Sequence, residues 1–184
     1  MKTRIIFWAA FSLLAAGCEV HMGPSDFWSR LLKTQADSGY YADKVRKLVT
    51  MLSGKVQEYE INKIAIIDLV DAEGRVPILG EYLASRLVED IAQRKVFRVA
   101  QKGEVYKALE TLELEPALFY SRDENKDIGQ KLNVQAIVQG KLTDLGTNLD
   151  VQLIMVDVMT GEVIASGTET LNRTKFAVEM FRHY

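Results

Sequence analysis

The sequence predicts an α/β protein of the α+β kind, in which helices pack on a mixed sheet. In the first half of the domain, segments with strand character alternate with segments that have helical periodicity. In the second half, three strand segments follow one another with short turns between them. Alternation favours parallel strands joined by helices, and consecutive strands favour an antiparallel meander. We therefore expect a βαβα start followed by a meander, without an internal repeat.

The domain is predicted to span residues 40–171 and to open with an amphipathic helix over residues 40–59. Apolar side chains recur there at three- and four-residue steps, at Val45, Leu48, Val49, Leu52, Val56 and Tyr59. Such a stripe either lies on the sheet or pairs with a partner, and the pattern leaves both open. Residues 63–70, "KIAIIDLV", are nearly all apolar, which is typical of a strand buried on both faces.

The next helix is predicted to start at Pro77, because proline suits a first helical turn, and to run to about Arg94. Its inner stripe consists of Leu79, Leu83, Leu87 and Ile91. Gly80 and Ala84 stand four residues apart beside that stripe. Two such small residues predict that this helix lies unusually close to the sheet.

A short strand over residues 96–100 and a helix over residues 103–112 complete the alternating part. Ser121 and Glu124 have the spacing of a capping box, which predicts a further helix that ends near Leu132.

The meander is predicted from residues 134–142, 149–158 and 160–171. The last of these segments begins with a Thr-Gly hairpin turn. Residues 172–184 form a C-terminal tail that is left open as a short helix or a frayed end.

The N-terminus reads "MKTRIIFWAAFSLLAAGC", a basic start followed by an apolar run. The run is shorter than the roughly 20 residues that a membrane span needs, and it is typical of a secretory signal peptide. Residues 15–18, Ala-Ala-Gly-Cys, resemble the bacterial lipobox, although that pattern usually has leucine where Ala15 stands. The resemblance implies cleavage after residue 17, attachment of diacylglycerol to the Cys18 thiol, and acylation, for example by palmitate, of the new amine. An ordinary signal peptide with a chance cysteine is the alternative.

Lipidation at Cys18 would hold the protein on a membrane without spanning it, because several acyl chains together anchor stably. Residues 18–39 are predicted to be a polar, irregular tether, with a breaker cluster at residues 23–25, "GPS". In lipoproteins an Asp after the acylated Cys commonly signals retention in the inner membrane. Glu19 stands at that place and favours the outer membrane, with the domain facing the periplasm.

Composition and charge exclude several classes of function. The formal net charge is −2, without the basic face that nucleic-acid binding calls for. The single cysteine cannot form an internal disulfide, and the two histidines, His21 and His183, stand near the chain ends. No phosphate-binding glycine motif is present. The sequence therefore predicts a non-catalytic protein without a cofactor, a metal site or a nucleic-acid partner.

Two clusters remain open to more than one interpretation. Asp68, Asp71 and Glu73 follow the first strand and either hold a divalent cation or form a solvated loop before a helix. The loop over residues 113–120 contains Leu114, Pro116, Leu118, Phe119 and Tyr120. These residues either cap the core or present a binding patch, and folding back onto the core is favoured.

Four stretches together resemble the FlgO domain family over residues 40–171. They are the amphipathic helix, "KIAIIDLVDAEGRVPILGEYLASRLVEDI", "VFRVAQKGEVYKALETL" and "LNVQAIVQGKLTDLGTNLDVQLIMVDVMTGEVIASGTETL". The resemblance implies an envelope lipoprotein linked to flagellar outer-membrane assembly and motility, without catalytic residues. Such a protein would act by contact with envelope or flagellar proteins, and the sequence leaves open whether it also forms a homo-oligomer.

The same elements are similar to the periplasmic domain of the CsgG curli secretion channel. That similarity implies the alternative function, a ring-forming secretion component. Channel subunits of this kind carry amphipathic hairpins that build a barrel, and the short connections here leave no segment for them.

Overall fold

The computed structural model describes residues 24–54, 56 and 59–183, with side chains from residue 39 onward. The chain divides into two compact units, Met1–Asp37 and Ser38–Tyr184. In its described part, the first unit contains only the start of helix α1 (Pro24–Ser53). The second unit contains the rest of α1 and all other elements. Among the described residues, no helix combines the length and apolar composition that crossing a bilayer requires.

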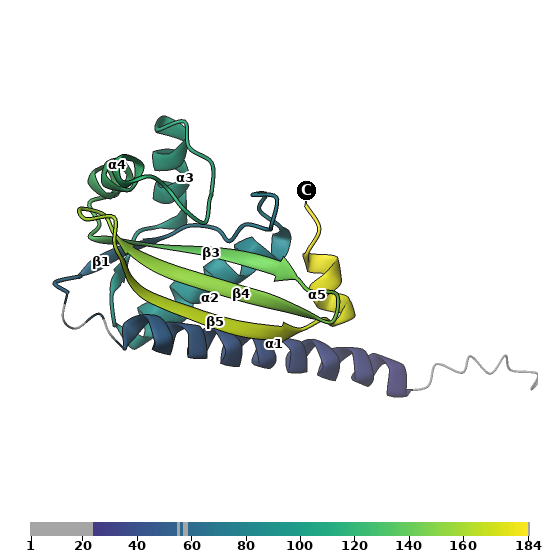
Figure 1. The fold of residues 1–184 in the computed structure, drawn as a ribbon. Coiled ribbons are helices and arrows are strands. Elements are labelled where there is room, and N and C mark those ends of the chain that lie inside the picture. Colours follow the sequence, from purple (N-terminus) through teal and green to yellow (C-terminus); the bar gives the residue numbers. More distant parts are fainter. Residues whose placement is uncertain (1–23, 55, 57–58, 184) are drawn as a thin grey trace, which may run out of the picture. The chain divides into compact units, whose positions relative to one another are not determined.

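The second unit is built on one five-stranded mixed sheet with the order β2-β1-β3-β4-β5 (Figure 1). The strands are β1 (Lys63–Ile66), β2 (Arg98–Val99), β3 (Ala136–Asp144), β4 (Asn148–Asp157) and β5 (Val163–Asn172). β1 pairs in parallel with β2 and β3, whereas β3, β4 and β5 form an antiparallel meander. The predicted fold class, with an alternating start and a strand meander, is therefore confirmed.

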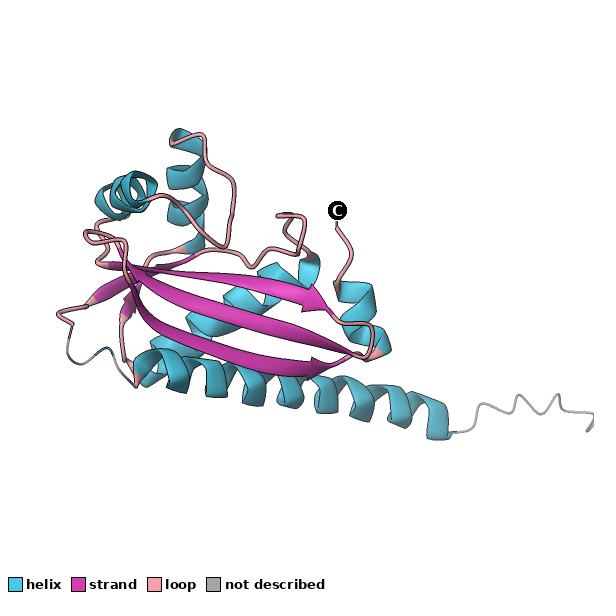
Figure 2. Ribbon diagram, in the orientation of Figure 1, coloured by secondary structure: helices cyan, strands magenta, loops and turns pink. Residues whose placement is uncertain are grey.

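Helices cover the two faces of the sheet unequally (Figure 2). The helices after α1 are α2 (Ile78–Arg94), α3 (Lys102–Thr111), α4 (Arg122–Leu132) and α5 (Lys175–Met180). One apolar core joins α1 and α2 to one face and includes Leu48, Leu83, Val138 and Leu153. A smaller core joins α3 and α4 to the other face and includes Ile67, Val105, Ile128 and Ile137. Of the two interpretations of the first amphipathic stripe, the one that places it on the sheet is therefore correct.

The bounds of α1 differ from those predicted. The expected irregular tether is helical from Pro24 to the end of its range. The proline of the predicted breaker cluster does not interrupt the helix, because it stands at the helix start, where its missing N–H loses no bond. The helix ends at Ser53 rather than at residue 59, directly before Gly54. Glycine is among the residues least favourable to a helix interior, and the Gly54 N–H closes the last turn on the Thr50 carbonyl.

The first two strands are shorter than predicted. β1 covers four residues of the expected 63–70, and β2 covers two of the expected 96–100. Beyond β1 the chain still follows β3, since the Ile67 N–H bonds the Val138 carbonyl and Val70 bridges Lys141. The prediction of burial on both faces is confirmed, since the side chains stay buried as far as Val70. Regular strand pairing, by contrast, ends at Ile66.

Two local predictions are confirmed. A Cβ atom added at Gly80 would lie 2.1 Å from the Leu69 carbonyl oxygen, so only glycine permits this approach of α2. The Ser121 hydroxyl accepts from the Glu124 N–H at 3.2 Å, and the Glu124 carboxylate accepts from the Ser121 N–H at 2.6 Å. These hydrogen bonds with Ser121 lower the pKa of Glu124. The tail forms the short helix α5, with Thr174 as its N-cap.

Candidate functional site

The predicted lipid attachment residue, Cys18, lies outside the described residues, as does His21. The anchor therefore stays a prediction. The described residues do include the surface of the second unit, whose hollows and charged clusters are the candidate binding sites.

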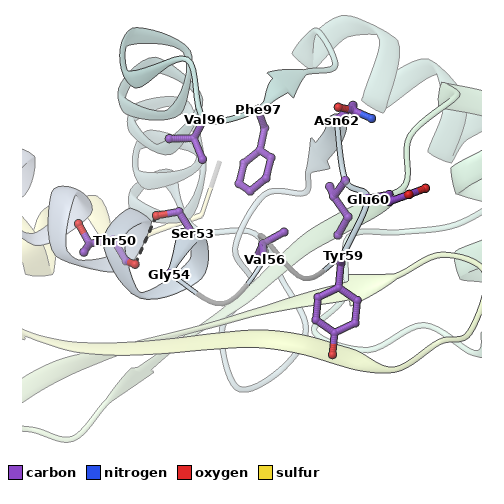
Figure 3. A pocket seen from close by; sticks show the side chains of 10 residues that line it. Thr50, Ser53, Gly54, Val56, Tyr59, Glu60, Asn62, Val96 and Phe97 are labelled. Carbon is purple, nitrogen blue, oxygen red and sulfur yellow. Dashed lines mark hydrogen bonds between the residues drawn. The ribbon is translucent and has the colours of Figure 1, made fainter.

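A groove of about 910 Å³ opens at the end of the sheet where β1 begins (Figure 3). Three segments line it: the end of α1, the chain that leads into β1, and the turn between α2 and β2. Val96 and Phe97 form one side, and Tyr59 stands at the opposite side. Tyr59 and Val96 are exposed, by 42% and 39% of their surface. The described lining mixes apolar side chains with polar ones, and Glu60 is its one charged residue.

A second hollow of about 520 Å³ lies beside the first and shares Tyr59, Glu60 and Ile61 with it. Its other walls come from α4 and from the turn between β4 and β5. That turn is held by the Asp157 carboxylate, which accepts from the Met159 and Thr160 N–H groups, and it leaves Met159 60% exposed. Tyr59, Val96 and Met159 therefore give this end of the sheet an open apolar surface, which we call the groove surface.

The sequence interpretation missed the role of Tyr59, which it placed on the inner stripe of a helix. Because α1 ends at Ser53, Tyr59 lies beyond the helix and is half exposed. Gly54 was the signal that could have indicated this, since glycine commonly follows the last residue of a helix.

The apolar loop over residues 113–120 mainly caps the core, as favoured. Leu114 and Tyr120 pack against the smaller core. The Tyr120 hydroxyl donates to the Glu115 carbonyl at 2.8 Å, and burial raises the pKa of Tyr120 strongly. Phe119 is the exception, with 67% of its surface exposed.

The acidic residues after β1 lie at the opposite end of the sheet and are bound by neighbouring side chains. Asp68 accepts a short hydrogen bond from the Tyr106 hydroxyl, and its other carboxylate oxygen lies 3.1 Å from Lys102 Nζ. Burial and the bond to Asp68 raise the pKa of Tyr106. Burial opposes the charge of Lys102, but its contacts with Tyr106 and Asp68 outweigh this and raise its pKa.

Asp71 organises the loop between β1 and α2. One carboxylate oxygen accepts from the N–H groups of Glu73 and Arg75, and the other lies 3.1 Å from the Arg75 guanidinium and 2.8 Å from His183 Nε2. Burial raises the pKa of Asp71, but the hydrogen bonds from Arg75 and Glu73 outweigh it and leave the pKa lowered.

The cation interpretation of Asp68, Asp71 and Glu73 finds no support in this geometry. Asp68 is bound by Lys102 and Tyr106, and the other two carboxylates share the guanidinium of Arg75. Within the described part of the chain, no three His, Cys, Asp or Glu side chains are grouped so that they could hold a metal ion.

Comparisons with known proteins agree with this fold. The C-terminal domain of LpoB from Salmonella enterica is similar with a TM-score of 0.56 and 17% identity, covering 72% of this chain and 98% of that one. The NMR structure of LpoB from E. coli is similar with a TM-score of 0.56 and 14% identity, covering 71% and 68%. At these identities the likeness shows the fold alone. No curated protein sequence matches the chain.

A family model described as FlgO protein matches residues 44–176, which is most of the chain and all five strands of the sheet. The chain therefore belongs to the FlgO family.

Proposed function

We propose that this protein is a non-catalytic lipoprotein of the outer membrane, anchored through Cys18 and facing the periplasm. It acts by protein–protein contact in the assembly of outer-membrane structures around the flagellum. The observation that carries the proposal is the family match over residues 44–176. The lipobox-like sequence before Cys18 supports the anchor, and the small negative charge fits a protein partner better than nucleic acid.

We further propose that the partner binds the groove surface. Exposed apolar side chains next to a concave surface are typical of binding sites on proteins. An aromatic or aliphatic side chain of a partner could enter the groove between Tyr59 and Phe97, with Met159 beside it. At the opposite end of the sheet, by contrast, the carboxylates of Asp68 and Asp71 are already bound by Lys102, Tyr106 and Arg75.

Swimming in soft agar tests the whole proposal. A strain that lacks the gene receives the wild-type gene, a Cys18→Ala gene, a Met159→Glu gene or a Leu145→Glu gene. Met159 and Leu145 are matched, since both are exposed apolar residues of hairpin turns, 60% and 56% exposed, at opposite ends of the sheet. Immunoblots of the membrane fraction measure how much of each variant is present and anchored.

We expect wild type and Leu145→Glu to restore swimming, and Cys18→Ala and Met159→Glu to fail. Cys18→Ala should also leave the membrane fraction, whereas Met159→Glu should remain in it. Normal swimming without the gene would refute the flagellar role. A Met159→Glu protein that restores swimming fully would refute the groove surface, and a membrane-bound Cys18→Ala protein would refute the anchor.

The CsgG-like alternative, a ring-forming secretion component, predicts a different result. The strain without the gene would then swim normally, and the detergent-extracted protein would migrate as a large closed assembly.

A further inference from the structure

The outer edge of β5 is the longest free strand edge in the described part of the molecule (Figure 1). β5 spans ten residues, Val163–Asn172, and pairs only with β4. The other edge strand, β2, has two residues. Proteins normally protect a long edge with lysine, proline or an uncompensated charge. β5 contains no lysine, arginine or proline, and its one charged side chain, Glu169, is bound by Lys44 of α1 at 2.8 Å.

Hydrogen bonds at the end of β5 show which backbone groups point outward. The Asn172 N–H donates to the Tyr40 hydroxyl, and the Asn172 carbonyl accepts from Thr174, so both groups point away from β4. The carbonyl of Asn148, which stands opposite Asn172, accepts from the Leu145 N–H and so points toward the β3 side. Since the direction alternates every second residue in an antiparallel pair, Ser166, Thr168 and Thr170 also point their backbone groups outward. All three residues are exposed.

We propose that β5 pairs antiparallel with β5 of a second copy of this chain, with Thr168 on the two-fold axis. Only this register pairs the three outward-pointing residues with one another: Thr168 with its own copy, and Ser166 with Thr170 in both directions. The pairing would form about six backbone hydrogen bonds and would join the two sheets into one. A two-fold contact of a surface with itself is the commonest way in which soluble proteins form oligomers.

The side chains support a second copy in this register. On the exposed face, hydroxyl residues stand opposite hydroxyl residues, which are favourable cross-strand pairs. On the face toward α1, Gly167 stands opposite Glu169 and Ala165 opposite Leu171, so small residues face large ones. The two Glu169 carboxylates are kept apart, because each lies opposite a glycine of the other copy.

Met51 would add apolar contact area near the proposed two-fold axis. A Cβ at Gly167 would lie 3.1 Å from the Met51 Cβ, so Met51 lies beneath the residue next to Thr168. Met51 is 42% exposed in one copy. In the proposed pair, the Met51 side chains of the two copies approach each other under the joined sheet.

Cysteine cross-linking of the mature, detergent-extracted protein tests the register. In Thr168→Cys, the two introduced thiols face each other across the axis, at a separation that a disulfide can bridge. In the matched control Thr170→Cys, the thiols are about 13 Å apart along the strands. We expect a covalent dimer under mild oxidation for Thr168→Cys and none for Thr170→Cys. Equal cross-linking of both variants, or of neither, would overturn the register.

Light scattering of two charge variants tests the dimer itself. Thr168→Lys places two ammonium groups opposite each other on the axis, whereas Gln152→Lys places the same group on the same face, one strand further in. We expect wild type and Gln152→Lys to have twice the monomer mass and Thr168→Lys to have the monomer mass, with equal circular dichroism spectra showing that all three proteins are folded. A monomeric wild type, or cross-linking of Thr168→Cys to a different protein, would overturn the proposal. The test does not depend on the flagellar assignment.

Discussion

The side chains at the two ends of the sheet differ in whether they are bound by neighbouring side chains or exposed. Where β1 ends, the carboxylates of Asp68 and Asp71 are bound by Lys102, Tyr106 and Arg75. Where β1 begins, Tyr59, Val96 and Met159 are exposed beside two hollows. The acidic residues after β1 were open to interpretation as a cation site from the sequence, yet in the fold they form ion pairs with Lys102 and Arg75. The apolar end is the one that we propose binds a partner, and four predictions test this contrast.

The largest effect on stability is expected at Gly80, where α2 lies against Leu69, near the end of the sheet at which β1 ends. Gly80→Ala should lower the free energy of unfolding by about 3 kcal/mol, because the new methyl group would collide with the Leu69 carbonyl. Urea denaturation measures the loss. The control is Gly103→Ala, where nothing lies within 4 Å of the added carbon. An unchanged midpoint for Gly80→Ala would show that α2 can move away from the sheet.

Asp71→Asn should lower the free energy of unfolding by about 1–2 kcal/mol at neutral pH, since charged hydrogen bonds are lost. The lowered pKa of Asp71 means that this stabilisation is present above the unfolded-state pKa and is lost as pH falls through the folded-state value. The difference between wild type and variant should therefore shrink in acid. Glu73→Gln, on an exposed side chain, should change little. A difference that grows in acid would contradict a structural role for the Asp71 carboxylate.

Tyr106→Phe should lower the free energy of unfolding by about 1 kcal/mol, because the bond to Asp68 is removed. The pKa of Tyr106 is raised in the folded state. Its stabilising contribution is therefore complete below the unfolded-state pKa and is lost as pH rises through the folded-state pKa. Denaturation between neutral and strongly alkaline pH should show the wild-type advantage fading at high pH. Tyr59→Phe, which removes a hydroxyl from an exposed side chain, serves as the control and should change the free energy of unfolding little. A constant difference at all pH values would mean that Tyr106 acts only by packing.

The smallest effect on stability is expected at the groove surface. Tyr59→Ser should change the free energy of unfolding by about 0.5 kcal/mol or less, because the side chain is half exposed. Swimming should nevertheless be reduced, while the matched variant Phe119→Ser, on another exposed aromatic residue, should swim normally. A large loss of stability for Tyr59→Ser would instead assign this residue to the core.

The sequence by itself determined the features that depend on near neighbours in the chain. The capping box of Ser121 and Glu124 and the start of α2 after Pro77 follow from local chemistry that any context would preserve. Apolar spacing likewise predicted which faces are buried, since period and burial are linked by helix and strand geometry. The family resemblance was also carried by the order of these elements, and the family match agrees with it.

Tertiary structure decided everything that depends on residues far apart in the chain. Lys102 and Tyr106 reach Asp68 across more than thirty positions because β1 and β2 are parallel neighbours and bring the start of α3 to the end of β1. The groove surface combines the end of α1, the turn before β2 and the β4–β5 turn, which the sequence treats separately. The free edge of β5 exists only because the strand order ends there. Periodicity reports which face of an element is buried, but it does not contain the order in which elements pair, and that order decides which surfaces stay open.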